Sequence, residues 1–191
     1  MGISNHTRRH TGNISPEYAL LGFLVPGPDH GYNLHQTVLH ELGHVWHLSQ
    51  SQAYTILKRL EIKGDISARV VEQSKLPDRQ LLRLTAQGRR RFTEWLEQGS
   101  ADNARAIRLE LLTRLYFSQL YKPEDTAAIF AAQSVAVGRN IERLEGVLAR
   151  LADGQPCNRL SLDLRIRQLR VIRTWMAEIR AEFHSSSEVT Q

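Results

Sequence analysis

Residues 40–44 read His-Glu-Leu-Gly-His, the order in which zinc hydrolases carry two metal ligands and a catalytic glutamate. On one continuous helix, His40 and His44 would bind a single Zn²⁺ and Glu41 would activate the metal-bound water. Ser49 can cap a new helix a short turn later, so a helix through residue 40 must end near Gly43 and leave His44 outside it. We therefore expect neither a metal nor catalysis here, and a zinc-dependent hydrolase stays an alternative.

Polar side chains of a different kind follow Ser49. Apolar residues spaced i, i+3, i+4 and i+7 from Ala53 to Leu60 predict a helix with one buried face. The rest of this helix carries short hydrogen-bonding groups near its start and two cations further along, which suit base edges and phosphates of DNA, respectively. The candidate DNA-contacting residues of this helix are Gln50, Ser51, Tyr54, Thr55, Lys58 and Arg59.

Local signals define the elements that would position this helix. A first helix is expected from the capping Ser15 to the Pro-Gly-Pro at residues 26–28, and a second over residues 30–42. The third helix begins with an S-x-x-Q capping box at Ser49 and has Gly64 at its expected C-terminal end. Three short helices in this order are typical of a helix-turn-helix domain.

Two extended runs follow, ISARVVEQ and RQLLRL, separated by the turn-forming segment SKLPD. They predict a β-hairpin whose partly basic tip would form the wing of a winged helix-turn-helix, with Lys75 and Arg79 beside the DNA backbone or minor groove. Thr85 then caps another helix. We therefore expect a DNA-binding domain over residues 14–98, preceded by a flexible arm at 1–13.

The second half of the chain is predicted to be helical. The small, polar segment at 99–104 marks the boundary, and a helical dimerisation domain over residues 105–184 precedes a disordered tail at 185–191. The last long helix carries apolar residues at 3/4 spacing, which predict packing against a second subunit, an intrachain helix, or both. The candidate dimerisation residues are Leu169, Ile172, Met176, Ile179 and Phe183. The fold class is thus mainly α with a small β-hairpin, an N-terminal winged helix-turn-helix and a C-terminal antiparallel long-helix dimerisation domain.

Composition and charge indicate the class of partner and the cellular compartment. The chain has 191 residues, a formal net charge of +5 concentrated in its first half, and a sequence pI near 9.7, which favours a polyanionic partner such as double-stranded DNA. Cys157 is the only cysteine, so a disulfide framework within the chain is excluded and a reducing cytoplasm fits. The polar start lacks the apolar core of a signal peptide, and no long apolar run occurs, so we expect no membrane association. No cofactor is expected.

Several linked motifs resemble the PadR-type transcriptional regulators. They are the run ALLGFLVPGPDHGYNL, the tryptophan at 46, the serine-capped helix in LSQSQAYTILKRLEIKGDI, and the wing exit LLRLTAQGRRRF. The likeness covers residues 16–96, and the long helical second half resembles the subgroup with a large C-terminal dimerisation domain. Thr55 stands where the family often has proline, and Leu81 and Leu82 stand where aromatic residues are frequent.

The resemblance implies a homodimer, usually a repressor, that binds a palindromic operator and in many members releases it when a small aromatic effector binds. By position, residues 50–63 would form the reading helix and residues 75–79 the wing. Trp46 and Trp95 are candidates for stacking a flat effector. A winged helix that contacts protein or RNA instead of DNA stays an alternative, which the salt dependence and sequence preference of duplex binding would separate.

Overall fold

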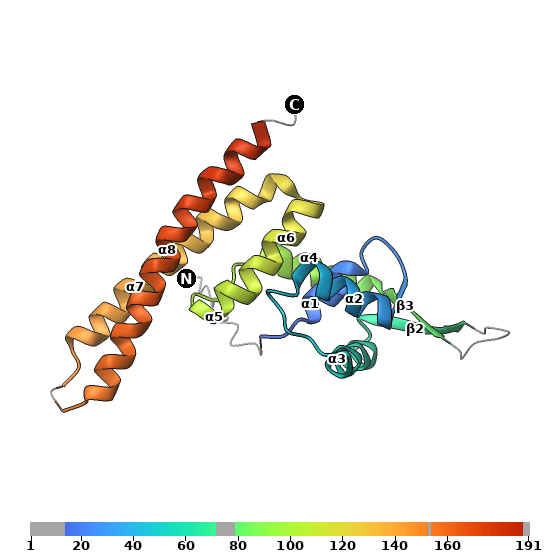
Figure 1. Ribbon diagram of the computed structural model, residues 1–191, viewed down its shortest axis with the longest axis horizontal. Helices are drawn as coiled ribbons and strands as arrows, with labels where there is room; N and C mark the ends of the chain where they lie inside the picture. Colours follow the sequence, from blue (N-terminus) through green and yellow to red (C-terminus); the bar gives the residue numbers. More distant parts are fainter. Residues whose placement is uncertain (1–13, 72–78, 153, 189–191) are drawn as a thin grey trace, which may run out of the picture. The chain divides into compact units, whose positions relative to one another are not determined.

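The computed structural model describes residues 14–71, 79–152 and 154–188, and the side chains of residues 70, 71, 79 and 180–188 lie outside this description. The chain is mainly helical with one small antiparallel sheet, which confirms the predicted fold class (Figure 1). None of the described helices combines the length and the apolar character required to span a bilayer. The contacts within the chain define two compact units, which we describe separately.

The first unit contains residues 14–98 together with Leu112–Phe117. Its elements are α1 (Glu17–Phe23), β1 (Asp29–His30), α2 (Gly31–Leu42), α3 (Gln50–Ile62), β2 (Ile66–Val71), β3 (Arg79–Leu84) and α4 (Ala86–Glu97). One apolar stripe of each helix is buried, and in α3 this is the predicted face of Ala53, Ile56, Leu57 and Leu60. The four helices thereby enclose a common core.

The sheet has the strand order β1-β3-β2 and is antiparallel throughout. The predicted hairpin is present, with Ile66 opposite Leu84, and both of these side chains are buried. The two-residue strand β1, which pairs Asp29 with Leu82, was not predicted. It ties the start of α2 to the strand that leaves the wing.

The segment between α2 and α3 begins where the sequence predicted. α2 ends at Leu42, and the backbone N–H groups of Val45 and Trp46 donate to the carbonyl oxygen of Leu42 to close the turn. Gly43 has φ −63° and is therefore not the left-handed stop that its position indicated. His44 lies in this turn, outside the helix that carries His40.

The second unit contains residues 99–111 and the described residues from 118 onward. Its elements are α5 (Ala104–Ala106), the π-helical η1 (Ile107–Leu111), the end of α6 (Leu112–Tyr121), the 3₁₀ turn η2 (Pro123–Asp125), α7 (Thr126–Ala149) and α8 (Pro156–Glu188). The long helices α7 and α8 pack side by side (Figure 1). Two buried polar side chains of α7 bind the loop that precedes α5. Gln133 donates a hydrogen bond to the carbonyl of Ala101, and Asn140 donates one to the carbonyl of Asp102.

The first part of α6, residues 112–117, belongs to the first unit, although it lies well beyond the boundary at 99–104 that composition predicted. Phe117 is fully buried against α1, where a Cβ atom added to Gly22 would lie 2.3 Å from its Cζ atom. The Nε1 group of Trp46 donates to Oγ1 of Thr113 over 2.7 Å. The fold of the first unit therefore needs a segment from the second half of the chain.

Candidate nucleic-acid interface

The start of α3 is fixed by the predicted capping box. The backbone N–H of Gln52 donates to Oγ of Ser49 over 3.3 Å, and the backbone N–H of Ser49 donates to Oε1 of Gln52 over 2.9 Å. At the other end, Gly64 adopts φ +76°, a left-handed conformation that favours glycine. Both ends of α3 are thus defined by side-chain chemistry within its own sequence.

The outward face of α3 carries the predicted base-reading groups. Gln50, Ser51 and Thr55 are exposed, whereas Ala53 and Leu60 on the opposite face are fully buried. Oγ1 of Thr55 donates to the carbonyl of Ser51 over 2.9 Å, so its hydroxyl proton is used within the helix and its oxygen still has lone pairs for a donor on a base. Because the buried face holds the helix in place, the exposed face is pre-positioned.

The two predicted phosphate ligands on α3 differ in their surroundings. Nζ of Lys58 is 3.0 Å from Oε2 of Glu61 on the next turn, and the Lys58 side chain is largely exposed. Nη2 of Arg59 donates to Oγ of Ser15 and to Oε2 of Glu17, each over 3.2 Å. Lys58 therefore faces solvent with a single weak restraint, whereas Arg59 fastens α3 to the start of α1.

Arg59 belongs to an ion-pair network that the sequence did not reveal. Arg91 of α4 binds both Glu17 of α1 and the buried Asp65 after α3. Burial disfavours the charged form of Arg91, but Glu17, Tyr18 and Asp65 outweigh that cost and its pKa lies above the ordinary value. These bonds join α1, the end of α3 and α4 into one frame.

The wing lies partly outside the described residues. Lys75 is among residues 72–78, which the structure does not describe, and for Arg79 only the backbone pairing with Val71 is described. At the base of the hairpin, Arg69 and Arg83 are exposed on the face opposite the buried Leu82 and Leu84. Sequence reasoning missed these two cations, although the alternation along the strands placed them on the outer face.

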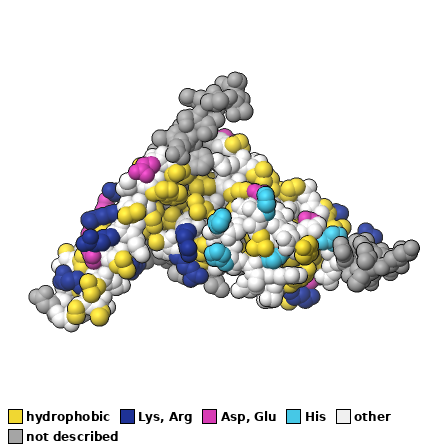
Figure 2. All heavy atoms as spheres, in the orientation of Figure 1, with side chains coloured by type: hydrophobic (Ala, Val, Ile, Leu, Met, Phe, Trp, Pro, Cys, Tyr) yellow, Lys and Arg dark blue, Asp and Glu magenta, His cyan; other side chains and the backbone are white. Residues whose placement is uncertain are grey.

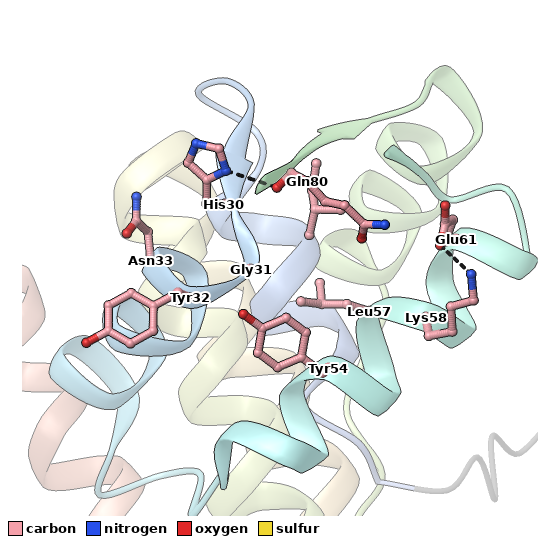
Figure 3. A pocket seen from close by; sticks show the side chains of 10 residues that line it. His30, Gly31, Tyr32, Asn33, Tyr54, Leu57, Lys58, Glu61 and Gln80 are labelled. Atoms are coloured by element: carbon pink, nitrogen blue, oxygen red, sulfur yellow. Dashed lines mark hydrogen bonds and ion pairs between the residues drawn. The ribbon is translucent and has the colours of Figure 1, made fainter. Parts of the chain in front are cut away.

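A groove of about 900 Å³ flanks α3 (Figure 3). It lies between the start of α2, the middle of α3 and strand β3, and its lining includes His30, Tyr32, Tyr54, Lys58 and Gln80. The imidazole of His30 bonds through Nδ1 to the carbonyl oxygen of Gln80 over 2.9 Å, which holds one rim together. Tyr54, predicted to face DNA, therefore lines this groove next to Lys58.

The two tryptophans that were candidates for an effector site lie in the core. Trp46 is 8% exposed and its Nε1 group is already bonded to Thr113. Trp95 is 7% exposed, with Tyr18 stacked on it at a centroid distance of 4.5 Å and the guanidinium of Arg114 over its ring at 4.7 Å. Neither indole presents an open face on which a flat ligand could stack.

The H-E-x-x-H segment has a structural role in the first unit. Nδ1 of His40 is 2.8 Å from Oε1 of Glu41, and the hydroxyl of Tyr116 donates to Oε2 of the same carboxylate over 3.0 Å. These bonds, first that of His40 and then that of Tyr116, lower the pKa of Glu41. The glutamate is thus engaged with α6, and the two histidines do not share a helix face.

The predicted dimerisation residues divide between two environments. Leu169 and Met176 are buried within the subunit, where α8 packs on α7, and Ile172 and Ile179 are half-buried. The side chain of Phe183 lies outside the described residues. A second apolar stripe, which the sequence analysis did not single out, is exposed on α8 and consists of Leu160, Leu164 and Val171.

Comparison with known proteins follows the same division of the chain. Residues 20–94 match the sequence model of the transcriptional regulator PadR-like family. Over this segment the chain is similar to that family. Residues 107–184 match a second model, the C-terminal domain of virulence activator alpha. The PadR-like family consists of transcriptional regulators and not of enzymes, so the zinc-hydrolase alternative is set aside.

One curated relative and two solved structures are similar to this chain over most of its length. The negative transcriptional regulator PadR of Bacillus subtilis (strain 168) is 26% identical over 148 residues, which are 77% of this chain and 81% of the relative. A solved structure of B. subtilis PadR in complex with operator DNA is 24% identical, with a TM-score of 0.44 and coverage of 87% of this chain and 98% of that one. The structure of smu.1604c from Streptococcus mutans UA159 is 19% identical, with a TM-score of 0.43 and coverage of 86% and 98%.

The PadR-like match ends within α4, so it contains the helices and strands of the winged helix but not residues 112–117. In this PadR-like chain those residues complete the core of the winged-helix unit. Besides the ion-pair network and the exposed apolar stripe of α8, sequence reasoning thus missed cations on the outer face of the wing and core partners supplied from a distant segment.

Proposed function

We propose that this PadR-like regulator is a homodimeric repressor that binds a palindromic operator in double-stranded DNA with α3 in the major groove. The observation that carries the proposal is the outward face of α3, where Ser51 and Thr55 are exposed on a helix whose opposite face is locked into the core. The role as a repressor is supported by the B. subtilis relative, which is named a negative transcriptional regulator.

Within this proposal the contacts have separate tasks. Gln50, Ser51 and Thr55 read base edges, and Lys58 neutralises a phosphate. Lys75 and Arg79 stay predicted wing contacts. Arg59 acts mainly through its bonds to α1, which orient α3 for the groove.

The test is selection of bound sequences from random duplex DNA by the purified protein, followed by affinity measurements on the selected operator. Thr55→Ala should lower the preference for the operator over random duplex by about 5- to 150-fold, because one base contact is worth roughly 1–3 kcal/mol. Lys58→Ala should weaken both duplexes equally. Thr37→Ala is the matched control, since its hydroxyl makes the same bond to the carbonyl four residues earlier, on α2. Absence of any selective complex would reject DNA reading and favour a protein or RNA partner.

The proposed dimer places two α3 helices at half-sites about 34 Å apart, one turn of DNA. At about 100° per residue, Leu160, Leu164 and Val171 lie on the side of α8 opposite Leu169 and Met176. Their side chains are 57% to 70% exposed in the isolated subunit, and apolar side chains are visible on the surface at the end of the α7–α8 pair where α8 begins (Figure 2). We place the subunit contact on this outer stripe, with Ile172 and Ile179 towards its margin.

Replacing Leu164 and Val171 with Asp should give a monomer in sedimentation experiments while the helical circular dichroism is retained. The monomer should bind operator DNA much more weakly, because each half-site then contributes only its own contacts. A variant that stays dimeric would remove the outer stripe from the interface.

Release of DNA by a small aromatic effector is the remaining part of the proposal, and only the resemblance to the PadR-like family supports it. The ligand must bind the DNA-competent and relaxed forms with different affinities, since only that difference can shift the equilibrium. Trp46 and Trp95 are not assigned to its site because both are enclosed by core residues. Titration of the operator complex with phenolic acids tests this part, and an unchanged complex at saturating ligand would reject it for that class.

A further inference from the structure

The groove beside α3 contains polar groups that the fold does not use. Tyr32 is 54% exposed and Tyr54 is 46% exposed, and neither hydroxyl has a hydrogen-bond partner among the described residues. The side-chain amide of Gln80 likewise has no partner within the described part of the chain. Three neutral hydrogen-bonding groups from α2, α3 and β3 thus border one groove.

The groove has an apolar base and close walls. Leu57 and Leu82 line it and are almost fully buried. Gly31, the first residue of α2, lets this helix approach the ring of Tyr54, because a Cβ atom at Gly31 would lie 3.1 Å from Cε1 of the tyrosine. Figure 3 shows Tyr54 on the α3 side of the groove, next to Gly31 and Tyr32. The ring of Tyr54 is therefore held by its surroundings, although its hydroxyl has no partner among the described residues.

The two charged side chains that line the groove neutralise each other, and the carboxylate of Asp29 beside it adds one negative charge. Lys58 and Glu61 form an ion pair, and Asp29 accepts hydrogen bonds from the backbone of His30 and the side chain of Asn33. The residue at the N-cap of α2, His30, gives no side-chain bond to the first turn. The groove is therefore bordered by neutral donors and the start of α2, and its lining residues carry no net positive charge.

We propose that this groove seats one segment of the sugar-phosphate backbone of DNA, with the hydroxyls of Tyr32 and Tyr54 and the amide of Gln80 as neutral hydrogen-bond donors. The inference rests on the proposed function, because the groove borders the reading face of α3 through Tyr54 and Lys58. Neutral side chains, backbone N–H groups and helix N-termini commonly contact phosphates and fix the register of a protein on DNA. Rings over an apolar base suit the sugar edge that accompanies the phosphate.

A neutral contact has a signature that separates it from a cationic one. Lys58 displaces a counterion when it neutralises a phosphate, so its loss reduces the slope of log K against log salt by about one. A tyrosine hydroxyl displaces none. Its loss should lower affinity without changing that slope.

The experiment compares Tyr54→Phe, Tyr32→Phe and the double variant with the wild-type protein. Each single variant should weaken binding to the selected operator and to random duplex alike, by about fivefold, the size of one neutral hydrogen bond. The salt slope should stay unchanged. The thermal midpoint should also stay unchanged, because neither hydroxyl has a partner among the described residues. Tyr116→Phe is the matched control, since its hydroxyl is bonded to Glu41 and should leave DNA affinity unaltered.

The outcomes distinguish a failure of the groove assignment from a failure of the proposed operator recognition. Wild-type affinity for both duplexes in the double variant would overturn the groove assignment while the reading face of α3 stands. A loss confined to the operator would also overturn it, because a backbone contact does not depend on sequence. If the wild-type protein selects no operator but the tyrosine variants still weaken binding to random duplex, the groove stands and the operator proposal fails.

Discussion

Gly22→Ala should destabilise the protein, against the usual effect of this substitution. In an exposed helix position, alanine is more favourable than glycine by about 0.5–1 kcal/mol. At Gly22 the added Cβ would lie 2.3 Å from Cζ of Phe117, well inside van der Waals contact. Phe117 cannot simply move away, because it is fully buried and makes edge contacts with the rings of Phe23 and Phe92 at 5.1 and 5.3 Å.

Overpacking of this kind costs about 1–3 kcal/mol, so the gain in helix propensity leaves a net loss of about 1–2 kcal/mol. For a chain of this length, that loss lowers the thermal midpoint by about 2–8 °C. The measurement is thermal unfolding followed by circular dichroism at one protein concentration, so that any dimer contributes equally to all variants.

Gly138→Ala in α7 is the matched control. The nearest atom to its added Cβ would be a terminal nitrogen of the flexible Arg173 side chain at 3.9 Å, so this variant should be slightly more stable than wild type. Phe117→Leu added to Gly22→Ala should recover part of the loss. If Gly22→Ala behaves like Gly138→Ala, Phe117 does not pack on α1 and residues 112–117 do not belong to the winged-helix unit.

Three further variants test individual contacts. Ser49→Ala removes the cap of α3 and should cost about 1 kcal/mol in chemical denaturation. Glu61→Gln frees Lys58 from its ion pair, so affinity for random duplex should rise and the salt slope should steepen in fluorescence titrations; unchanged binding would place Lys58 away from phosphate. Tyr116→Phe should raise the pKa of Glu41 part-way towards its ordinary value in an NMR titration, because the bond from His40 remains. A carboxylate with a lowered pKa stabilises the fold only while it is ionised, so this stability is lost as the pH falls through that pKa. The loss of stability should be smaller in the variant than in the wild type.

The features that the sequence predicted well are those decided within a few residues. The capping box at Ser49 and the left-handed Gly64 depend on side-chain and backbone chemistry local to α3, and both are found as predicted. The amphipathic spacing from Ala53 to Leu60 identified the buried face of α3 for the same reason. From this face, the exposure of Ser51 and Thr55 follows by geometry alone.

The features that were missed depend on partners far apart in the chain. Strand β1 has only two residues, and its pairing with β3 leaves no periodic pattern. The bond between Trp46 and Thr113 joins residues 67 positions apart. The sequence therefore does not distinguish a tryptophan that is buried in the core from one that lines a ligand site. Composition placed the boundary at 99–104, but the core of the winged-helix unit still required Phe117.

The two apolar sides of α8 show that periodicity detects an apolar stripe without identifying its partner. A 3/4 repeat detects any apolar stripe, but it does not say whether the partner is in the same subunit. In the structure α7 covers Leu169 and Met176, and an interface built on those residues would have to open the subunit first. Leu164 and Val171 lie on the other side of α8 and can meet a second copy while the α7–α8 contact is kept. Charge placed at Leu169 should therefore unfold the helical unit, whereas charge placed at Val171 should separate subunits that remain folded.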